Sequence, residues 1–195
     1  MTSDVEFLNF IKTGDTESFK NSIESNPELA FAKDNHSNTA LHYAARFKRL
    51  EILETLVNNL DVNNLEDLNT CNDKNKTALH LLAIHNNDTN NNTTKIIMLM
   101  LDKGAKPEIQ DFDKNTPLHI ALKSRRTDNA ELLINHLFES NKIQSLYFKN
   151  SEGETPSSIA EKVGLSRIGD KILEPLATPR TTLAKTLTEK TVLQR

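Results

Sequence analysis

The sequence predicts an all-α repeat solenoid, a row of helix-turn-helix units stacked side by side. The first observation is a short motif that occurs four times: T-P-L-H-I-A at 116–121, T-A-L-H-Y-A at 39–44, T-A-L-H-L-L at 77–82 and, degraded, T-P-S-S-I-A at 155–160. The second is the spacing, because the leading threonines are 38, 39 and 39 residues apart. Self-similarity at a near-constant period is the sequence sign of stacked repeats.

Each copy of the motif has the residues that begin a helix. Thr116 can cap the first free backbone N–H groups, and Pro117 occupies a position at which its missing N–H costs nothing. Leu118 and Ala121 lie on one side of the helix, and the small Ala121 lets a neighbouring helix approach. The motif therefore predicts one short helix in each unit.

The chain divides into five units: 4–33, 34–72, 73–110, 111–149 and 150–173. The first unit lacks the motif, as a terminal capping unit can, since one of its faces meets water. Its apolar residues over 7–11 predict a helix that breaks at Gly14. Those over 19–23 predict a second helix that stops at Pro27.

The second and third units each predict a helix and a returning helix. In the second unit these are expected over 39–47 and 50–57, where apolar residues follow the i, i+3, i+4 pattern. In the third unit the returning helix is expected over 95–102, and Gly104 stops it. The Asn-rich stretch 86–92 is too polar to pack and is predicted to be a looped-out insertion.

The last two units follow the same plan. A turn over 123–128, a returning helix over 130–137 and a longer connection over 139–148 are expected in the fourth unit. Pro175 is predicted to end the fifth unit. The composition changes after it, and residues 174–195 are predicted to form a flexible, Thr-rich tail.

Composition excludes several classes of protein. A net charge of −3 argues against nucleic-acid binding, which usually requires a basic domain. No run of about 18 apolar residues predicts a membrane span, and the acidic amino terminus has no secretory signal. Cys71 is the only cysteine, so no internal disulfide can form and a reducing, cytoplasmic location is expected.

The motif, together with the Gly104-Ala105 exit and the Asp-x-Asp that precedes Thr116, resembles ankyrin-repeat proteins over about residues 4–173. The resemblance implies an L-shaped stack of short inner helices, longer outer helices and projecting β-hairpin loops, with protein binding as the usual activity. The family's period is about 33 residues. The longer units here place their extra residues at different points, so irregular hairpins are expected.

The repeated histidines invite a metal or acid–base interpretation. Each occupies the same place in its unit, so the resemblance implies a structural role in which the ring ties its own turn to the next one. The residues predicted to be structural are Thr39, His42, Thr77, His80, Thr116, Pro117 and His119. No metal-binding, glycine-rich or nucleophile motif is present, so we expect no enzyme and no catalytic residue, cofactor or metal.

The resemblance places partner binding at the hairpin tips and at the ends of the inner helices. The tip residues are Asn35, His36, Asn38, Lys74, Lys76, Phe112 and Asp113. The helix-end residues are Arg46, Phe47, Ile84, His85 and Lys123, followed by Lys162 in the last unit. Phe47 and Ile84 have an alternative role, packing back onto the neighbouring unit. The basic pairs Lys48-Arg49 and Arg125-Arg126 are predicted to be solvated turn residues.

The predicted function is a non-catalytic module, monomeric, that binds a protein and neither nucleic acid nor membrane. A narrower hypothesis is an effector that an intracellular microbe secretes into a host cell, based on the Asn bias and the polar tail. The alternative is an inhibitor or regulatory subunit of an enzyme, which would use the same face. A remote alternative is an enzyme that recruits residues of the insertions.

Overall fold

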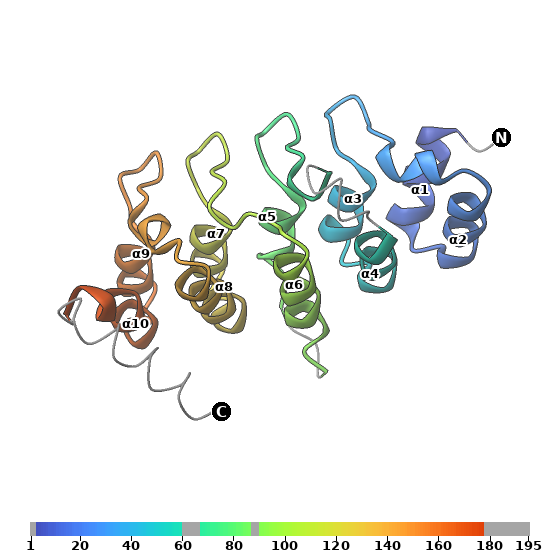
Figure 1. The fold of residues 1–195 in the computed structure, drawn as a ribbon. Helices are drawn as coiled ribbons and strands as arrows, with labels where there is room; N and C mark the ends of the chain where they lie inside the picture. Colours follow the sequence, from blue (N-terminus) through green and yellow to red (C-terminus); the bar gives the residue numbers. More distant parts are fainter. Residues whose placement is uncertain (1–2, 60–66, 87–89, 178–195) are drawn as a thin grey trace.

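The computed structural model describes residues 3–59, 67–86 and 90–177, and within these ranges it is a row of stacked helix pairs (Figure 1). The ten α-helices are α1 (Asp4–Thr13), α2 (Thr16–Ser25), α3 (Ala40–Arg46), α4 (Leu50–Asn59), α5 (Ala78–Leu82), α6 (Asn92–Asp102), α7 (Pro117–Lys123), α8 (Thr127–Glu139), α9 (Pro156–Lys162) and α10 (Ser166–Ala177). Three short 3₁₀ turns lie between them: η1 (Pro27–Phe31), η2 (Asp67–Asn69) and η3 (Ile143–Tyr147). The all-α solenoid is confirmed.

The helices form an inner and an outer row. The inner row is α1, α3, α5, α7 and α9, the outer row is α2, α4, α6, α8 and α10, and loops project from one side of the stack (Figure 1). Each inner helix packs on its own outer partner and on the inner helix of the next unit. Buried apolar residues form thin layers within and between units, and in the first unit the rings of Phe7 and Phe19 stack with centroids 5.6 Å apart. These thin layers explain how a chain with few aromatic residues builds a core.

Besides α8, which begins at Thr127 instead of residue 130, three boundaries differ from the sequence expectations. Helix α6 begins at Asn92 instead of residue 95, because the buried Thr93 donates its hydroxyl to the carbonyl of Asn86 at 3.0 Å and holds the first turn. Residues 87–89 of the predicted insertion lie outside the described ranges. The connection over 139–148 contains η3.

The third difference lies at the end of the array, where α10 continues past Pro175 to Ala177. Proline removes one backbone N–H from the helix ladder, but the residues that follow it can keep helical dihedral angles. The predicted tail therefore begins inside a helix, and its remaining residues 178–195 lie outside the described part of the chain.

Four tight turns form the projecting loops, and all four have the same internal geometry. The first residue of each turn is Asp34, Asn72, Asp111 or Asn150, and its side-chain Oδ1 accepts the backbone N–H of the fifth residue at 2.8–3.0 Å. The fourth residue has a left-handed backbone and is Ser37, Asn75, Lys114 or Gly153. Asp and Asn stabilise such turns because their short side chains mimic a backbone acceptor.

Backbone hydrogen bonds join each turn to the next. Asp73 donates to the carbonyl of His36 at 3.0 Å, Phe112 to Lys74 at 3.1 Å, and Ser151 to Asp113 at 2.8 Å. No strand occurs in the described residues, and the one isolated β-bridge pairs Lys33 with Thr39. The projecting loops therefore do not form regular two-stranded hairpins, but backbone hydrogen bonds connect each loop to the next along the array.

The threonines and histidines of the motif close the first turn of each inner helix. Thr39, Thr77 and Thr116 donate their backbone N–H to Nδ1 of the histidine three residues later, at 3.1–3.2 Å. Because that N–H can only donate, Nδ1 must be unprotonated, and the ring proton lies on Nε2. The unprotonated Nδ1 replaces the carboxylate or amide of a common capping box.

The other ring nitrogen reaches the next unit. Nε2 of His42 donates to the carbonyl of Lys76 at 2.8 Å, that of His80 to Asn115 at 3.1 Å, and that of His119 to Phe148 at 3.1 Å. The three rings are almost fully buried, and both nitrogens of each are bonded. Each ring thus joins its own helix start to the following unit.

Burial lowers the pKa of His42, His80 and His119, because a charged ring is poorly solvated there, and the pKa of His80 falls from 6.5 to about 4. A charged ring would also carry a proton on Nδ1, which would then face the donating threonine N–H. The three rings are neutral at pH 7 for both reasons.

Acidification should destabilise the array before most carboxylates protonate. A histidine with a folded pKa below its unfolded pKa stabilises the protein fully above pH 6.5, and this stability is lost as the pH falls toward 4. We expect His80 alone to remove about 3 kcal/mol from the unfolding free energy across this window. Urea unfolding at pH 7.5 and pH 4.5 measures the loss. His80→Gln should flatten the pH dependence, and equal flattening by His36→Gln at the exposed turn would contradict the assignment.

Lys114 offers a test of the turn geometry. Its φ is 56°, a backbone region that is unfavourable for a lysine and open to glycine, and its side chain is exposed. We expect Lys114→Gly to raise the unfolding free energy by about 0.5–1 kcal/mol, because relief of the left-handed strain exceeds the entropy of the new glycine. Thermal unfolding measures the change. Lys149→Gly is the control, and an equal gain there would contradict the explanation.

Candidate partner-binding surface

The stacking places equivalent residues of successive units in a row at the ends of the inner helices. We call Lys12, Arg46, Ile84, Lys123 and Lys162 the helix-end row. Four of them lie two residues before a turn residue with positive φ, namely Gly14, Lys48, Arg125 and Gly164. Ile84, like Arg46, Lys123 and Lys162, lies seven residues after the threonine of its motif. Four of the five members are cations.

The predicted tip residues differ in their exposure. Phe112 is 71% exposed, and Asn35, His36, Lys74 and Asp113 are also exposed. Lys76 is half-buried, and its ammonium lies 3.5 Å from the buried carboxylate of Asp111. Asn38 is half-buried too, and its side-chain oxygen accepts a hydrogen bond from Asn72 at 2.8 Å. Some tip side chains are therefore free to contact a partner, whereas Lys76 and Asn38 are bound to residues of the neighbouring turns.

The helix-end residues also divide into free and engaged groups. Ile84 is 47% exposed and Arg46 is exposed. Phe47 is half-buried, with its ring 6.0 Å from both the Tyr43 ring and the Arg46 guanidinium. These contacts lie on its own helix and are not the packing onto the neighbouring unit that was the alternative prediction, and part of the Phe47 ring stays accessible.

His85 is engaged inside the stack. Its Nε2 donates to the carbonyls of Ala45 and Arg46 at 2.8 and 3.1 Å, at the carboxyl end of α3. Burial lowers the pKa of His85, although these carbonyls raise it in part. The side chain joins two units, and this bonding leaves it less available to a partner than the sequence pattern implied.

The basic turn residues make similar contacts. The Arg49 guanidinium donates to the carbonyl of Lys12 at 2.8 Å, Arg126 donates to that of Ile84 at 2.7 Å, and Lys48 donates to Asn86 at 2.7 Å. The last carbonyls of a helix lack partners within the helix and favour cations. The sequence predicted solvated residues here, whereas three of them bind the carbonyls of neighbouring units. Sequence spacing did not reveal this role because the acceptors are backbone atoms.

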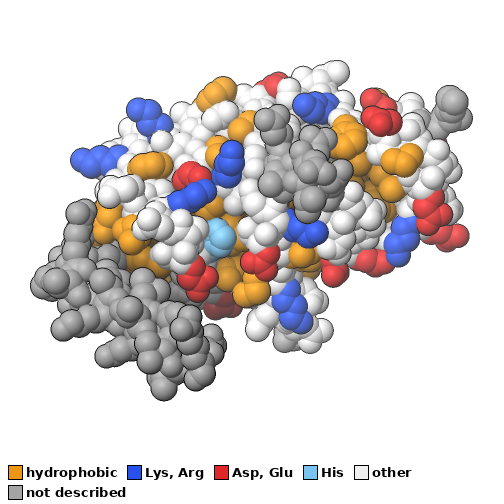
Figure 2. All heavy atoms as spheres, viewed as in Figure 1, with side chains coloured by type: hydrophobic (Ala, Val, Ile, Leu, Met, Phe, Trp, Pro, Cys, Tyr) orange, Lys and Arg blue, Asp and Glu red, His pale blue; other side chains and the backbone are white. Residues whose placement is uncertain are grey.

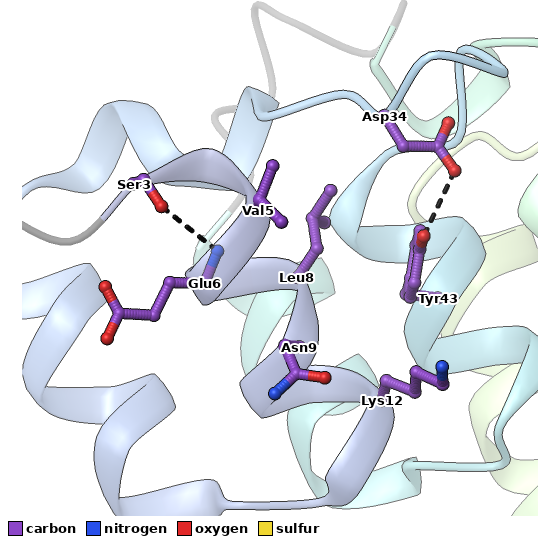
Figure 3. Close-up of a pocket in the computed structure, with 8 residues that line it drawn as sticks. All are labelled: Ser3, Val5, Glu6, Leu8, Asn9, Lys12, Asp34 and Tyr43. Carbon is purple, nitrogen blue, oxygen red and sulfur yellow. Dashed lines mark hydrogen bonds between the residues drawn. The ribbon is translucent and has the colours of Figure 1, made fainter.

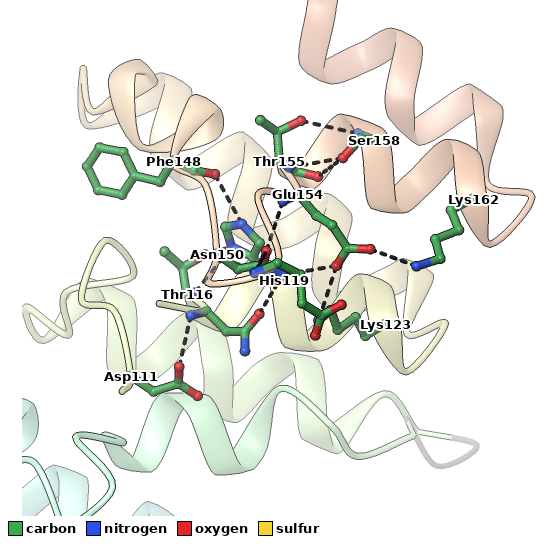
Figure 4. Close-up of polar contacts among 12 residues, drawn as sticks. Asp111, Thr116, His119, Lys123, Phe148, Asn150, Glu154, Thr155, Ser158 and Lys162 are labelled. Carbon is green, nitrogen blue, oxygen red and sulfur yellow. Dashed lines mark hydrogen bonds and ion pairs between the residues drawn. The ribbon is translucent and has the colours of Figure 1, made fainter. Parts of the chain in front are cut away.

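An acidic residue neutralises the carboxyl-terminal part of the helix-end row. Glu154 accepts hydrogen bonds from Lys162 at 2.8 Å and from Asn150 at 3.0 Å, and Lys123 lies 3.2 Å away (Figure 4). These contacts, with Lys162 foremost, lower the pKa of Glu154 to about 2. Lys123 also pairs with Glu152 at 3.1 Å. Both lysines are therefore already paired with carboxylates of the last turn.

The amino-terminal part of the row lines a groove instead. A hollow of about 580 Å³ lies between α1 and the start of the second unit, and Val5, Leu8, Lys12 and Tyr43 face it (Figure 3). A second hollow, of about 240 Å³, adjoins it. The second hollow shares Lys12, Asp34 and Tyr43 with the first and extends to His36, Asn38, His42, Arg46 and Phe47. We call the two hollows the N-terminal groove.

Sequence reasoning missed several residues of this groove. Lys12 could have been found by counting two residues back from Gly14, and Tyr43 by its position directly after a motif histidine. Val5 and Leu8 gave no signal, because the first unit lacks the motif. Arg46 and Phe47 were predicted, and the structure places them in the same groove as Lys12.

Asp34 is the carboxylate at the centre of the groove. Burial alone would raise its pKa, but hydrogen bonds from Asn38, His36 and Tyr43 outweigh burial and lower the pKa of Asp34. Its oxygens accept from two backbone N–H groups, the Asn38 amide and the Tyr43 hydroxyl at 2.8–3.1 Å. Its hydrogen-bonding capacity is largely used within the turn.

The described residues contain no cluster of three or more His, Cys, Asp or Glu side chains that could hold a metal ion. Cys71 is half-buried, and burial raises the pKa of its thiol, which favours the unreactive form. Over the ranges that the structure describes, no helix is long and apolar enough to span a membrane. On the face drawn in Figure 2, side chains of both charges alternate with hydrophobic ones.

Comparison with known proteins agrees with the repeat geometry. Two family models match, ankyrin repeats (many copies) over residues 24–82 and ankyrin repeats (3 copies) over residues 64–145. The phosphate system positive regulatory protein of Saccharomyces cerevisiae is 33% identical over 171 residues, covering 74% of this chain and 14% of that protein.

Two further relatives are shorter or weaker matches. The human transient receptor potential cation channel subfamily A member 1 is 28% identical over 96 residues, covering 49% of this chain and 8% of that protein. The mouse ankyrin repeat and IBR domain-containing protein 1 is 29% identical over 163 residues, covering 70% of this chain and 14% of that protein. The chain thus spans at most 14% of the length of these three relatives.

Proposed function

Because this chain belongs to the ankyrin-repeat family, whose arrays are protein-interaction modules, we propose that it binds a protein partner through the turn tips and the helix-end row. One observation carries the proposal. The threonine, leucine and histidine of the motif are buried in the second, third and fourth units, whereas Arg46, Ile84 and Phe112 beside them are exposed. Side chains that stacking does not use are available for contact, and Arg and aromatic residues often dominate interface energies.

The rigidity of the surface supports this role. The turns are joined by backbone hydrogen bonds, and the histidines bind them to the helices. A preorganised surface loses little conformational entropy when it binds. A partner would therefore meet a surface already in its binding conformation.

The proposed role is non-catalytic, and the proposed binding species is a monomer. Chemistry usually requires an enclosed, water-excluding pocket, whereas the two hollows of the N-terminal groove are open. Nucleic acid is not the proposed partner. Lys123 and Lys162 of the helix-end row are bound to carboxylates, and the neighbouring Lys48, Arg49 and Arg126 to carbonyls, so the row offers no continuous basic stripe to a phosphate backbone.

A regulatory version of the same function has one observation in its favour. The yeast relative is named as a positive regulatory protein of a phosphate system. An inhibitor or regulatory subunit of an enzyme would use the same binding surface, so this version differs only in the identity of the partner. The secreted effector remains a prediction from composition alone.

Substitution of the exposed Arg46 and Phe112 together with the half-buried Phe47 tests the proposal. We expect Arg46→Ala, Phe47→Ala and Phe112→Ala together to reduce partner capture by at least about tenfold, because central Arg and aromatic residues each contribute about 1–2 kcal/mol or more. The measurement is quantitative mass spectrometry after affinity capture from the native cell. The unfolding temperature should change little, since surface substitutions usually change stability by about 0.5 kcal/mol.

A matched control lies on the outer helices. Lys95→Ala, Met98→Ala and Leu173→Ala also remove one cation and two exposed apolar side chains, but from α6 and α10. Capture should persist in this control. Unchanged capture by the first variant, or equal loss in the control, would exclude the proposed surface.

A further inference from the structure

We propose that the N-terminal groove binds an extended acidic peptide segment of the partner that carries one large apolar side chain. This inference rests on the proposed function and names the chemistry of the partner. In the bound arrangement, the apolar side chain occupies the hollow lined by Val5, Leu8 and Tyr43. The acidic side chains lie beside Lys12 and Arg46.

The first argument is a contrast within the helix-end row. Lys123 and Lys162 pair with Glu152 and Glu154 at 2.8–3.2 Å. Lys12 and Arg46 occupy equivalent positions, yet within the described ranges neither forms an ion pair. The same scaffold position is thus neutralised at one end of the array and available to an anion at the other.

The second argument is that the groove does not neutralise these cations itself. Asp34 is the only carboxylate of the smaller hollow, and it already accepts four hydrogen bonds. The guanidinium of Arg49 lies against the carbonyl of Lys12 and adds a further positive charge. Beside the carboxyl end of α1, the three cations Lys12, Arg46 and Arg49 therefore outnumber the single carboxylate, Asp34.

The third argument is the polarity along α1. Glu6 lines the larger hollow near Ser3, whereas Lys12 lies at the opposite end of it (Figure 3). Six residues of helix separate them, which is about 9 Å along the axis. Val5, 79% exposed, and Leu8 lie on the same helix between the amino end and Lys12. The groove thus offers an apolar region followed by a cationic one.

These features favour a peptide over a polyanion. Val5 and the accessible parts of Tyr43 and Phe47 offer apolar surface, which a nucleic-acid backbone does not use. Two free cations are few for phosphate-backbone binding, which accumulates from many contacts. The planar guanidinium of Arg46 matches a carboxylate in a two-bond geometry. A carboxylate-rich segment with one apolar anchor fits both regions.

The test uses the ¹⁵N-labelled full chain and a synthetic peptide, Gly-Leu-Gly-Asp-Glu-Asp-Gly, with both ends blocked. We expect NMR amide shifts at Val5, Lys12, Tyr43 and Arg46, and weaker binding at higher salt. The matched peptides replace the three acids with lysine or the leucine with glycine, and both should bind at least about fivefold more weakly. Equal binding of the lysine peptide, or shifts confined to other residues, would overturn the proposal.

Charge-removing variants complete the test. Lys12→Gln with Arg46→Gln should raise the dissociation constant about tenfold, whereas Lys95→Gln with Arg167→Gln, on the outer helices, should leave it unchanged. Circular dichroism checks that both variants fold. Equal loss in both variants, no shift at millimolar peptide, or stronger shifts of the same amides with a thymidine oligonucleotide would also overturn it.

The inference and the proposed function fail in different ways. If the Arg46, Phe47 and Phe112 variant loses its partner but the acidic peptide does not bind, the proposed binding surface is supported. The inference that the partner contributes an acidic peptide is then wrong. If the peptide binds but that variant keeps its partner, the groove is real and the proposed function falls.

Discussion

The structure depends on a neutral imidazole held between two units. In His42, His80 and His119 one ring nitrogen accepts from the backbone that starts its own helix, and the other donates to a carbonyl of the next unit. Both bonds exist only while the ring carries a single proton in one tautomer. Burial enforces that state by disfavouring the charged ring. Each of these histidines therefore both closes the first turn of its own helix and binds that helix to the next unit.

At the carboxyl ends of α1, α3 and α5, donors from the following unit complete the stack. Arg49 and His85 bind the last carbonyls of α1 and α3, and Arg126 binds the carbonyl of Ile84, two residues past the end of α5. Side chains of these types are common in binding sites, but here each gives at least one donor to the stack. The surface left for a partner is what these structural contacts do not use, namely the exposed tips and the amino-terminal part of the helix-end row.

That surface changes along the array although the scaffold does not. The last turn carries Glu152 and Glu154, which neutralise Lys123 and Lys162. In the turn 34–38 the positions equivalent to Glu152 and Glu154 are His36 and Asn38, and Lys12 and Arg46 stay unpaired in the described part of the chain. A regular stack thereby acquires one end with available cations and exposed apolar surface, which is where we propose that the acidic peptide binds.

The sequence by itself determined the fold class, the positions of the inner helices and the buried role of the motif, because these follow from contacts a few residues apart that recur in every unit. It also predicted Arg46, Phe47 and Phe112 as surface residues. Only the tertiary structure decided that Arg49 and His85 serve the stack, that α6 begins at Asn92, and that Lys12 joins Arg46 beside Tyr43. The start of α6 depends on a hydrogen bond to Asn86, seven residues before Thr93. The other facts depend on backbone carbonyls and side chains that lie about 30 to 40 residues away in sequence, and no periodic pattern records such contacts.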